Sequence, residues 1–123
     1  MALRPDLVIG APFQTRAGLA PLKAQGLTLL ELPRGEGVAA IEASITTLAA
    51  AVGHPERGMR MIARMRHALA AVGPPPGRGR VAAYYQRQGY LTGTGTLVDE
   101  MFRRVGLVNL AGRLGRPALS PLS

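Results

Sequence analysis

Short apolar runs bounded by turn-forming residues mark the beginning of the chain. The run Leu7 to Ile9 lies between Pro5 and Gly10, which is typical of a short buried strand. Leu27 to Leu32 predicts a second strand, and Arg16 to Gln25, followed by a glycine, predicts a short helix between the two. A strand, a helix and a strand in this order form a compact βαβ unit, whose strands we expect to be parallel.

Two consecutive helices are predicted in the middle of the chain. Gly37 to Val52 has apolar residues at i, i+3, i+7, i+10 and i+14, the spacing of one helical face. After Gly53, a second helix opens at Pro55 and runs to about Val72. At about 18 residues it is roughly 27 Å long, enough to bridge two lobes. Its apolar arc consists of Met59, Ile62, Met65, Leu69 and Val72, and its basic side of Arg57, Arg60, Arg64 and His67.

The remainder of the chain follows a segment rich in proline and glycine. We interpret this segment, Gly73 to Gly79, as a linker, because prolines lack amide donors and glycines are conformationally loose. Beyond it, Val81 to Tyr85 predicts a strand, and Thr96 to Val105 predicts a helix with Thr96 as its N-cap. No element is predicted in the proline-rich tail, Leu114 to Ser123. The aromatic, glycine-rich loop between strand and helix lies where open α/β sheets bind ligands.

The composition limits the size of the molecule and its chemistry. With 123 residues, of which 47% are apolar, the chain is one modest domain or part of something larger. It has no cysteine, which excludes disulfides and thiolate chemistry and leaves the redox compartment open. The first ten residues carry no secretory signal and no run approaches the roughly 18 apolar residues of a membrane span, so we expect a soluble chain as written.

A net charge of +8 would favour an anionic partner. Fourteen of the fifteen basic residues are arginine, and they are scattered from Arg4 to Arg116. The one dense group is Arg57, Arg60, Arg64 and Arg66. Because no nucleic-acid-binding motif accompanies the charge, we interpret it as a solvated face and expect no nucleic-acid partner.

Candidate catalytic and metal-binding groups are few. The two histidines, His54 and His67, have no partner in sequence, which argues against a histidine-based metal site. The Gly93 to Thr96 segment precedes a helix, where amides favour anions, but its spacing matches neither common phosphate-loop pattern. Asp99 and Glu100 are adjacent on a helix and diverge by about 100°, so Asp99 is interpreted as a dipole partner. We expect no catalytic residue, no metal site and no cofactor.

Several segments, in their order, resemble the substrate-binding proteins of ABC importers for iron complexes and cobalamin. In those proteins two α/β lobes are joined by one long helix. The matching segments are Leu3 to Ile9, Gly26 to Leu29, Val52-Gly53 with Glu56 to Gly58, Arg80 to Ala111, Gly93-x-Gly95-Thr96 and Gly106-x-x-Asn109. Each motif alone occurs widely, and the specificity lies in their ordered combination.

The resemblance implies an α/β fold of two partial Rossmann-like lobes joined by a long backbone helix. Residues 1–53 would form the partial amino-terminal lobe, 54–73 the inter-lobe backbone helix, 74–79 the linker and 80–123 the partial carboxyl-terminal lobe. Whole binding proteins of this kind are about twice as long, so each lobe would leave strand edges and apolar faces uncovered. We therefore expect marginal stability or self-association of the chain.

The resemblance also implies a periplasmic function without catalysis. The protein would capture a metal chelate, an iron-siderophore, haem or a corrinoid, between its lobes and deliver it to an ABC permease. The alternative is a cytosolic α/β domain that binds a nucleotide or another anion. Permease docking in the family uses an acidic residue on each lobe, where this chain has Ala17 and Leu122. Glu36, Glu42 and Glu56 are the candidate substitutes.

In the family, loops at the strand ends touch the ligand. These positions fall on Phe13 and Gln14 after the first strand and on Tyr85, Gln86, Arg87 and Tyr90 after the third. Aromatic faces with a few polar groups suit a bulky macrocycle or metal chelate, and Arg87 can pair with a carboxylate or hydroxamate oxygen. Core packing is the alternative for Tyr84 and Tyr85, and we favour it for Tyr84. For Phe13 and Tyr90, both placed in loops, ligand binding and an ordinary surface position are equally open.

Overall fold

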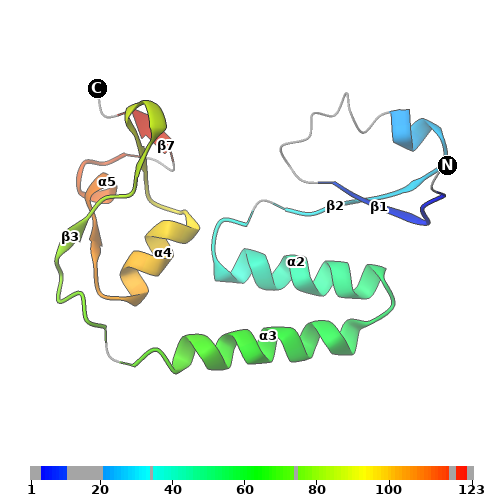
Figure 1. Cartoon of the computed structure of the whole chain (residues 1–123), viewed down its shortest axis with the longest axis horizontal. Coiled ribbons are helices and arrows are strands. Elements are labelled where there is room, and N and C mark those ends of the chain that lie inside the picture. The colour runs from blue at the N-terminus through cyan, green and yellow to red at the C-terminus, as the bar shows by residue number, and fades with distance from the viewer. Residues whose placement is uncertain (1–3, 11–20, 34, 74, 117–118, 122–123) are drawn as a thin grey trace.

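Two groups of short strands lie at opposite ends of the molecule, connected by a pair of long helices (Figure 1). The computed structural model describes residues 4–10, 21–33, 35–73, 75–116 and 119–121. The described residues form both helices and strands, and the predicted α/β fold is confirmed.

The amino-terminal group is the predicted βαβ unit. Strand β1 (Leu7–Gly10) pairs in parallel with β2 (Thr28–Glu31), in the register Leu7 with Thr28 and Gly10 with Glu31. Residues 21–24 are helical and end at a turn in which Gly26 has φ 76°, a conformation that favours glycine. The earlier part of the predicted helix lies outside the described residues. Both predicted strands are confirmed, as is their parallel pairing.

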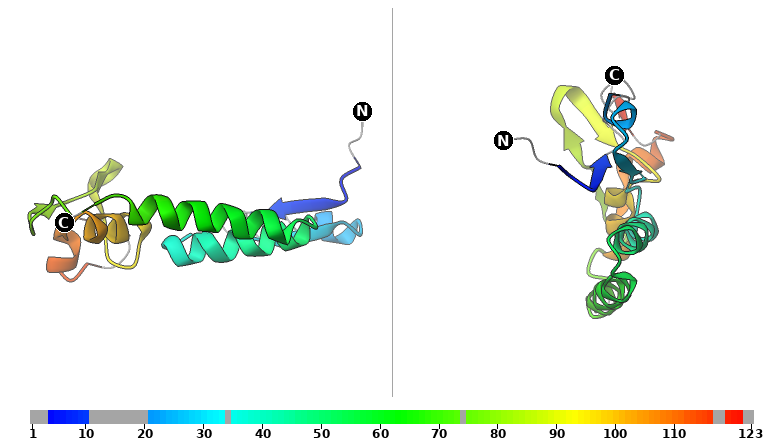
Figure 2. Two further views of the ribbon diagram at one scale, coloured as in Figure 1. Left: turned by 90° about the horizontal axis from the view of Figure 1, so that it is seen from below. Right: turned by 90° about the vertical axis from the view of Figure 1, so that its right-hand side faces the viewer.

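Helices α2 (Val38–Ala51) and α3 (Pro55–Ala70) lie side by side as an antiparallel pair (Figures 1 and 2). The two helices are in close contact at Gly58, where an added Cβ would lie 2.6 Å from the Ala49 Cβ. Further along, the Arg66 guanidinium donates to both carboxylate oxygens of Glu42, at 2.6 and 2.7 Å. Figure 1 shows α3 leading from the amino-terminal part to the carboxyl-terminal part, as expected of a bridging helix.

The carboxyl-terminal group contains two small sheets. Strand β3 (Val81–Ala82) pairs in parallel with β6 (Val108–Asn109). The second sheet has the order β4 (Tyr85–Gln86), β5 (Tyr90–Thr92) and β7 (Leu119–Pro121), all antiparallel. The short η1 helix (Arg87–Gly89) connects β4 to β5. Helix α4 (Leu97–Arg104) precedes β6, and α5 (Leu110–Arg113) follows it.

Two predictions for this part of the chain are wrong. The strand expected over Val81 to Tyr85 ends at Ala82, because its parallel partner β6 ends after two residues, where Asn109 caps α5. Tyr85 then pairs with β5 in the other sheet. The tail in which no element was expected contains β7, a strand formed by pairing with β5 rather than by a pattern of its own.

The described part of the proline- and glycine-rich segment is attached to the carboxyl-terminal part by backbone hydrogen bonds. The Gly77 amide donates to the Val105 carbonyl at 2.8 Å, and the Gly79 amide donates to Gly106, also at 2.8 Å. The Val108 amide in turn donates to Arg80 at 2.9 Å. These bonds hold the entry to β3 against the end of α4.

Few of the described residues are deeply buried. Among the described residues the buried apolar side chains are Val38, Ala49, Leu91 and Ala111. The chain exposes 8986 Å², whereas a compact monomer of this mass exposes about 6,300 Å². The elongated outline in Figure 2 accounts for this excess, since α2 and α3 share one layer with few elements covering it.

Candidate functional site

A tight hairpin brings together the four candidate ligand-binding residues of the carboxyl-terminal part. Tyr85 is paired with Leu91, and Gln86 with Tyr90, across the antiparallel β4–β5 ladder. Arg87 begins the connecting η1 turn. Tyr90 therefore lies in a strand, and its expected loop position is wrong. Phe13 and Gln14, the candidates of the amino-terminal part, lie outside the described residues.

The hairpin exposes some of its side chains and not others. Tyr85 is 65% exposed, and its hydroxyl lies 4.0 Å from the position that a Cβ at Gly89 would occupy, at the turn. Arg87 is exposed, whereas Gln86 and Tyr90 are half-buried. A phenol and a guanidinium thus face solvent at one tip, which is a suitable surface for a ligand with both aromatic and anionic parts.

Tyr84, for which core packing was favoured, is 50% exposed, and this prediction is wrong. Its backbone carbonyl accepts the Thr92 amide at 3.1 Å, which fixes the main chain while the ring remains in solvent. The two-residue β3–β6 ladder is too small to cover an aromatic ring on this side.

A buried polar cluster lies at the base of the hairpin, and sequence reasoning did not identify it. Its members are Thr92, Asp99 and Asn109, each between 5% and 7% exposed. The Asn109 amide nitrogen donates to the Thr92 carbonyl at 3.2 Å and to Asp99 Oδ1 at 3.1 Å. Asp99 Oδ2 lies 3.4 Å from Arg103 Nε. The one signal in the sequence was the Gly106-x-x-Asn109 motif, which carries no information on its contacts.

The glycine-rich loop before α4 is occupied by its own hydrogen bonds. Thr96 is the N-cap, as predicted, and its hydroxyl accepts the Asp99 amide at 3.2 Å. The same hydroxyl donates to the Gly93 carbonyl at 2.9 Å. Asp99 and Glu100 place two carboxyl groups in the first turn of α4. A phosphate at this helix end would meet negative charge, so the arrangement favours a structural loop over a phosphate site.

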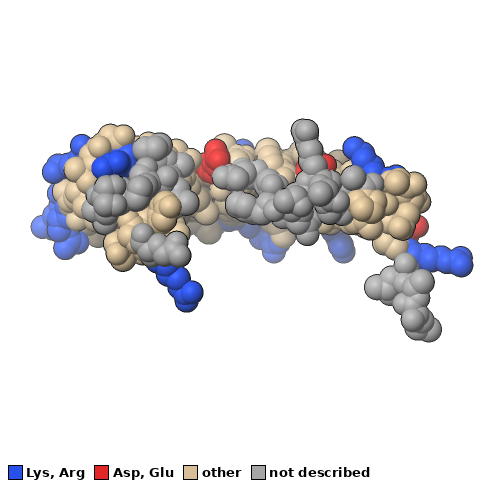
Figure 3. Space-filling model, turned by 90° about the horizontal axis from the view of Figure 1, so that it is seen from above, with Lys and Arg blue, Asp and Glu red and all other residues tan. Residues whose placement is uncertain are grey.

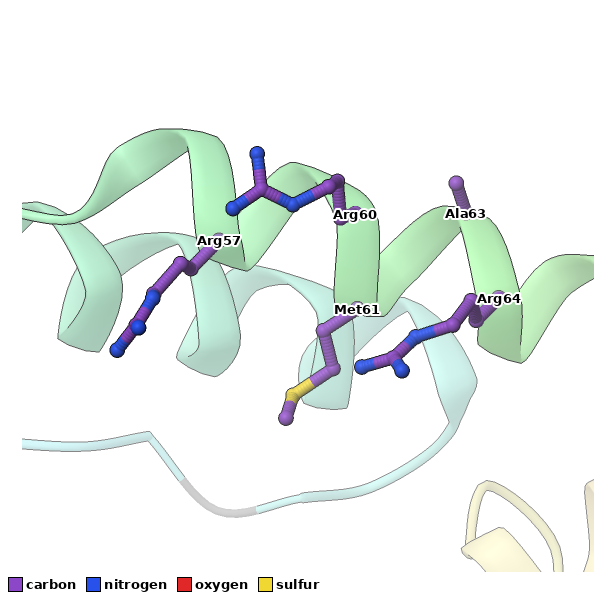
Figure 4. A pocket seen from close by; sticks show the side chains of 5 residues that line it. All are labelled: Arg57, Arg60, Met61, Ala63 and Arg64. Atoms are coloured by element: carbon purple, nitrogen blue, oxygen red, sulfur yellow. The ribbon is translucent and has the colours of Figure 1, made fainter.

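The basic residues form no continuous patch on the face seen in Figure 3, where blue side chains are separated by uncharged surface. On α3, an open hollow of about 560 Å³ is lined by Arg57, Arg60, Met61, Ala63 and Arg64. Figure 4 shows Met61 between Arg57 and Arg64, with Arg60 pointing away from them. One helix provides all of this lining, and the hollow contains none of the candidate ligand-binding residues.

The candidate acidic residues for permease docking differ in their surroundings. Glu42 is held by Arg66, and this hydrogen bond lowers the pKa of its carboxyl. Glu56 Oε1 lies 3.6 Å from His54 Nδ1, and Glu36 is exposed. Ala17 and Leu122 lie outside the described residues.

Two further properties of the described residues bear on function. They contain no group of three His, Cys, Asp or Glu side chains suited to a metal ion. No helix in the described ranges combines the length and apolar character needed to cross a bilayer.

A family model described as periplasmic binding protein matches residues 1–121. Among solved structures, a possible iron-binding, periplasmic solute-binding protein from Staphylococcus epidermidis shares 14% identity at a TM-score of 0.82. The periplasmic haem-binding protein RhuT from Roseiflexus sp. RS-1 shares 29% identity at a TM-score of 0.74. The periplasmic haem-binding protein BhuT, solved with two haems, shares 24% identity at 0.73.

All three alignments cover 97% of this chain, but they cover only 49%, 48% and 48% of the matched chains. The chain therefore spans about half the length of these structures. No curated protein sequence matches it.

Proposed function

The chain belongs to the periplasmic binding protein family, and from this membership we propose that it supplies part of the solute-binding component of an ABC importer. The complete component would capture its ligand in the periplasm, between two lobes, and deliver it to the permease. Binding requires closure around the ligand, and no covalent bond of the ligand is made or broken. The boundaries proposed from the sequence, 1–53, 54–73, 74–79 and 80–123, would then separate the two lobes from the helix and linker.

Haem is the ligand we favour among the metal chelates. The Roseiflexus protein, which is 29% identical, is described as haem-binding. Iron in haem proteins takes an axial ligand from His, Cys, Met or Tyr. Of these ligand types, residues 85–92 of the hairpin contain only tyrosine, at Tyr85 and Tyr90. Siderophores and corrinoids remain the competing cargoes.

The observation that carries the proposal is the exposure of Tyr85, at 65%, two residues before the exposed Arg87. We assign the Tyr85 phenol to the iron and the Arg87 guanidinium to a haem propionate, which a planar, permanently charged group binds well. The half-buried Tyr90 would present its ring to the macrocycle. Phe13 and Gln14 are proposed to contribute from the other lobe.

The test is titration with ferric haem, followed by absorbance. It uses both the 123-residue chain and a copy extended through neighbouring coding sequence, since the matched structures are about twice as long. Tyr85→Phe should weaken binding at least about tenfold and remove the absorbance band of tyrosinate-bound iron. Tyr84→Phe is the matched control, because this exposed neighbouring phenol has no assigned role, and its affinity should be unchanged.

Three other results would count against the proposal. Equal affinities of Tyr85→Phe and Tyr84→Phe would remove Tyr85 from the site. Saturable binding of cobalamin or a ferric siderophore, without haem binding, would change the cargo. A response to ATP alone, lost at high salt, would instead favour the cytosolic anion-binding alternative.

A further inference from the structure

We propose that Asn109 is a positioning residue for the Tyr85–Thr92 hairpin and acts on it through Thr92. The inference rests on the proposed function, which assigns the ligand to this hairpin. Asn109 is 5% exposed and lies beneath the hairpin rather than on its surface. Asn109 therefore acts on the ligand through the hairpin and not by direct contact.

Asn109 forms hydrogen bonds through both its side-chain nitrogen and its side-chain oxygen. Its side-chain nitrogen donates to the Thr92 carbonyl at 3.2 Å and to Asp99 Oδ1 at 3.1 Å. Its side-chain oxygen accepts the Ala111 amide at 3.1 Å and caps α5. A primary amide offers two donors and a carbonyl oxygen, so this set uses both kinds of group. Asn109 thereby joins the base of the hairpin to both α4 and α5.

Thr92 connects Asn109 to the exposed tip of the hairpin. The Thr92 hydroxyl accepts the Gln86 side-chain amide at 2.6 Å, and the Thr92 backbone amide donates to Tyr84 at 3.1 Å. Gln86 lies between Tyr85 and Arg87, the two residues assigned to the ligand. Fixing Thr92 therefore fixes Gln86 in β4 through the Thr92 side chain, and Tyr84, the residue before β4, through the Thr92 main chain.

A ligand-binding role for the buried cluster itself is disfavoured. Among the described residues, no buried side-chain nitrogen or oxygen lacks a hydrogen-bond partner. Asp99 is shared between Asn109 and Arg103. Because the hydrogen-bonding groups are already used within the protein, the cluster is suited to holding the hairpin in place.

Asn109→Asp separates the positioning role from the helix cap. Aspartate retains an oxygen for the Ala111 amide and is a good N-cap residue, but it cannot donate to Thr92. The second variant, Asn109→Asp with Asp99→Asn, exchanges amide and carboxylate. It removes the repulsion between two carboxylates and restores a hydrogen bond between positions 99 and 109, while still lacking the donor to Thr92.

Hydrogen exchange on the 123-residue chain tests the inference without any ligand. In the double variant, the Thr92 amide should exchange about tenfold faster. This is the change expected when one stabilising hydrogen bond, here from Asn109 to the Thr92 carbonyl, is lost. Amides that end α2 and α3, at Val52 and Ala71, should be unchanged. Unchanged exchange at Thr92 in the folded double variant would overturn the inference.

Ferric haem titration of the extended protein then links position to function. The double variant should bind haem several-fold more weakly and show a broadened tyrosinate band, although Tyr85 and Arg87 are intact. If exchange at Thr92 becomes faster but the haem affinity and the tyrosinate band are unchanged, the positioning role of Asn109 in binding is wrong. If the unsubstituted protein binds no haem, the proposed cargo fails, and the exchange measurement still decides whether Asn109 holds the hairpin.

Discussion

The Glu100 carboxylate of α4 accepts a hydrogen bond from the Val38 amide at 2.8 Å, so a side chain from the carboxyl-terminal part caps the first turn of α2. Helix α2 has no cap of its own, because Gly37 occupies the N-cap and its first turn contains no acidic residue. A Cβ at Gly37 would lie 2.8 Å from the same carboxylate oxygen. Arg104 holds the other oxygen of Glu100 at 2.6 Å.

Replacing Glu100 by Gln should lower the free energy of unfolding by about 1 kcal/mol. The amide retains an oxygen near Val38 but loses the charge that favours a helix amino terminus and pairs with Arg104. Urea unfolding followed by circular dichroism measures the change. Glu31→Gln is the control, since Glu31 is exposed on β2 and has no ion pair among the described residues. Equal losses from the two variants would contradict the capping role.

Acidification should destabilise the chain through the same contacts. The Val38 amide and then Arg104 hold the pKa of Glu100 below its usual value of 4.5. Because its pKa is lower in the folded state, the ionised Glu100 carboxylate stabilises the fold above about pH 4.5. This stability is lost as the pH falls through the pKa of the folded state. Urea unfolding in a series of acidic buffers checks this. Glu100→Gln should lose less stability on acidification than the unsubstituted chain. If the stability of both falls equally with pH, Glu100 is not the group responsible.

Periodicity predicted the parts of this fold that depend on neighbours in sequence. The spacing of Val38, Ile41 and Ile45 was sufficient to predict α2, and Thr96 was sufficient to predict the cap of α4. Both signals lie within one or two turns of sequence. The contact of Glu100 with Val38 joins residues 62 apart. No local pattern carries such a pairing.

The candidate site was predicted in part for the same reason. Aromatic and basic residues after a strand marked the segment Tyr85 to Tyr90, but its folding into a hairpin depends on pairing with Leu91 and its neighbours. Tyr84 was expected in the core on residue type alone. It is exposed because each strand of the adjoining β3–β6 sheet is only two residues long, which is a property of the tertiary structure. Asn109 was part of a family motif whose buried contacts only the structure reveals.

Gly77→Ala should destabilise the carboxyl-terminal part by about 1–3 kcal/mol. A Cβ at this position would lie 2.5 Å from the Val105 carbonyl oxygen and 2.6 Å from the Gly106 carbonyl carbon. Backbone atoms cannot move aside without breaking the hydrogen bonds that hold the segment to α4. Thermal unfolding measures the effect. Gly35→Ala is the control and should be nearly neutral, because among the described residues its Cβ would meet only the Ile41 side chain, at 3.7 Å.

Gly58→Ala should also destabilise the chain, although alanine is the better helix former. The new Cβ would lie 2.6 Å from that of Ala49, at the close contact of α2 with α3. Adding Ala49→Gly removes this clash, so the double variant should be more stable than the sum of the single changes predicts. A double-mutant cycle by urea unfolding gives the coupling. Additive single effects would place the strain elsewhere, for instance at the Ile45 carbonyl, 3.4 Å away.

Exposed apolar surface should make the chain self-associate or leave it marginally stable. Met59 is 66% exposed, Val72 60% and Ile9 47%, and the chain exposes well above the area expected of a compact monomer. The sheets have two or three strands among the described residues, so unpaired edges are available to a second copy. Sedimentation velocity over a range of protein concentrations should show mass rising with concentration, or thermal scans a broad, low transition. A sharp, concentration-independent unfolding transition of a monomer would show that these faces need no cover.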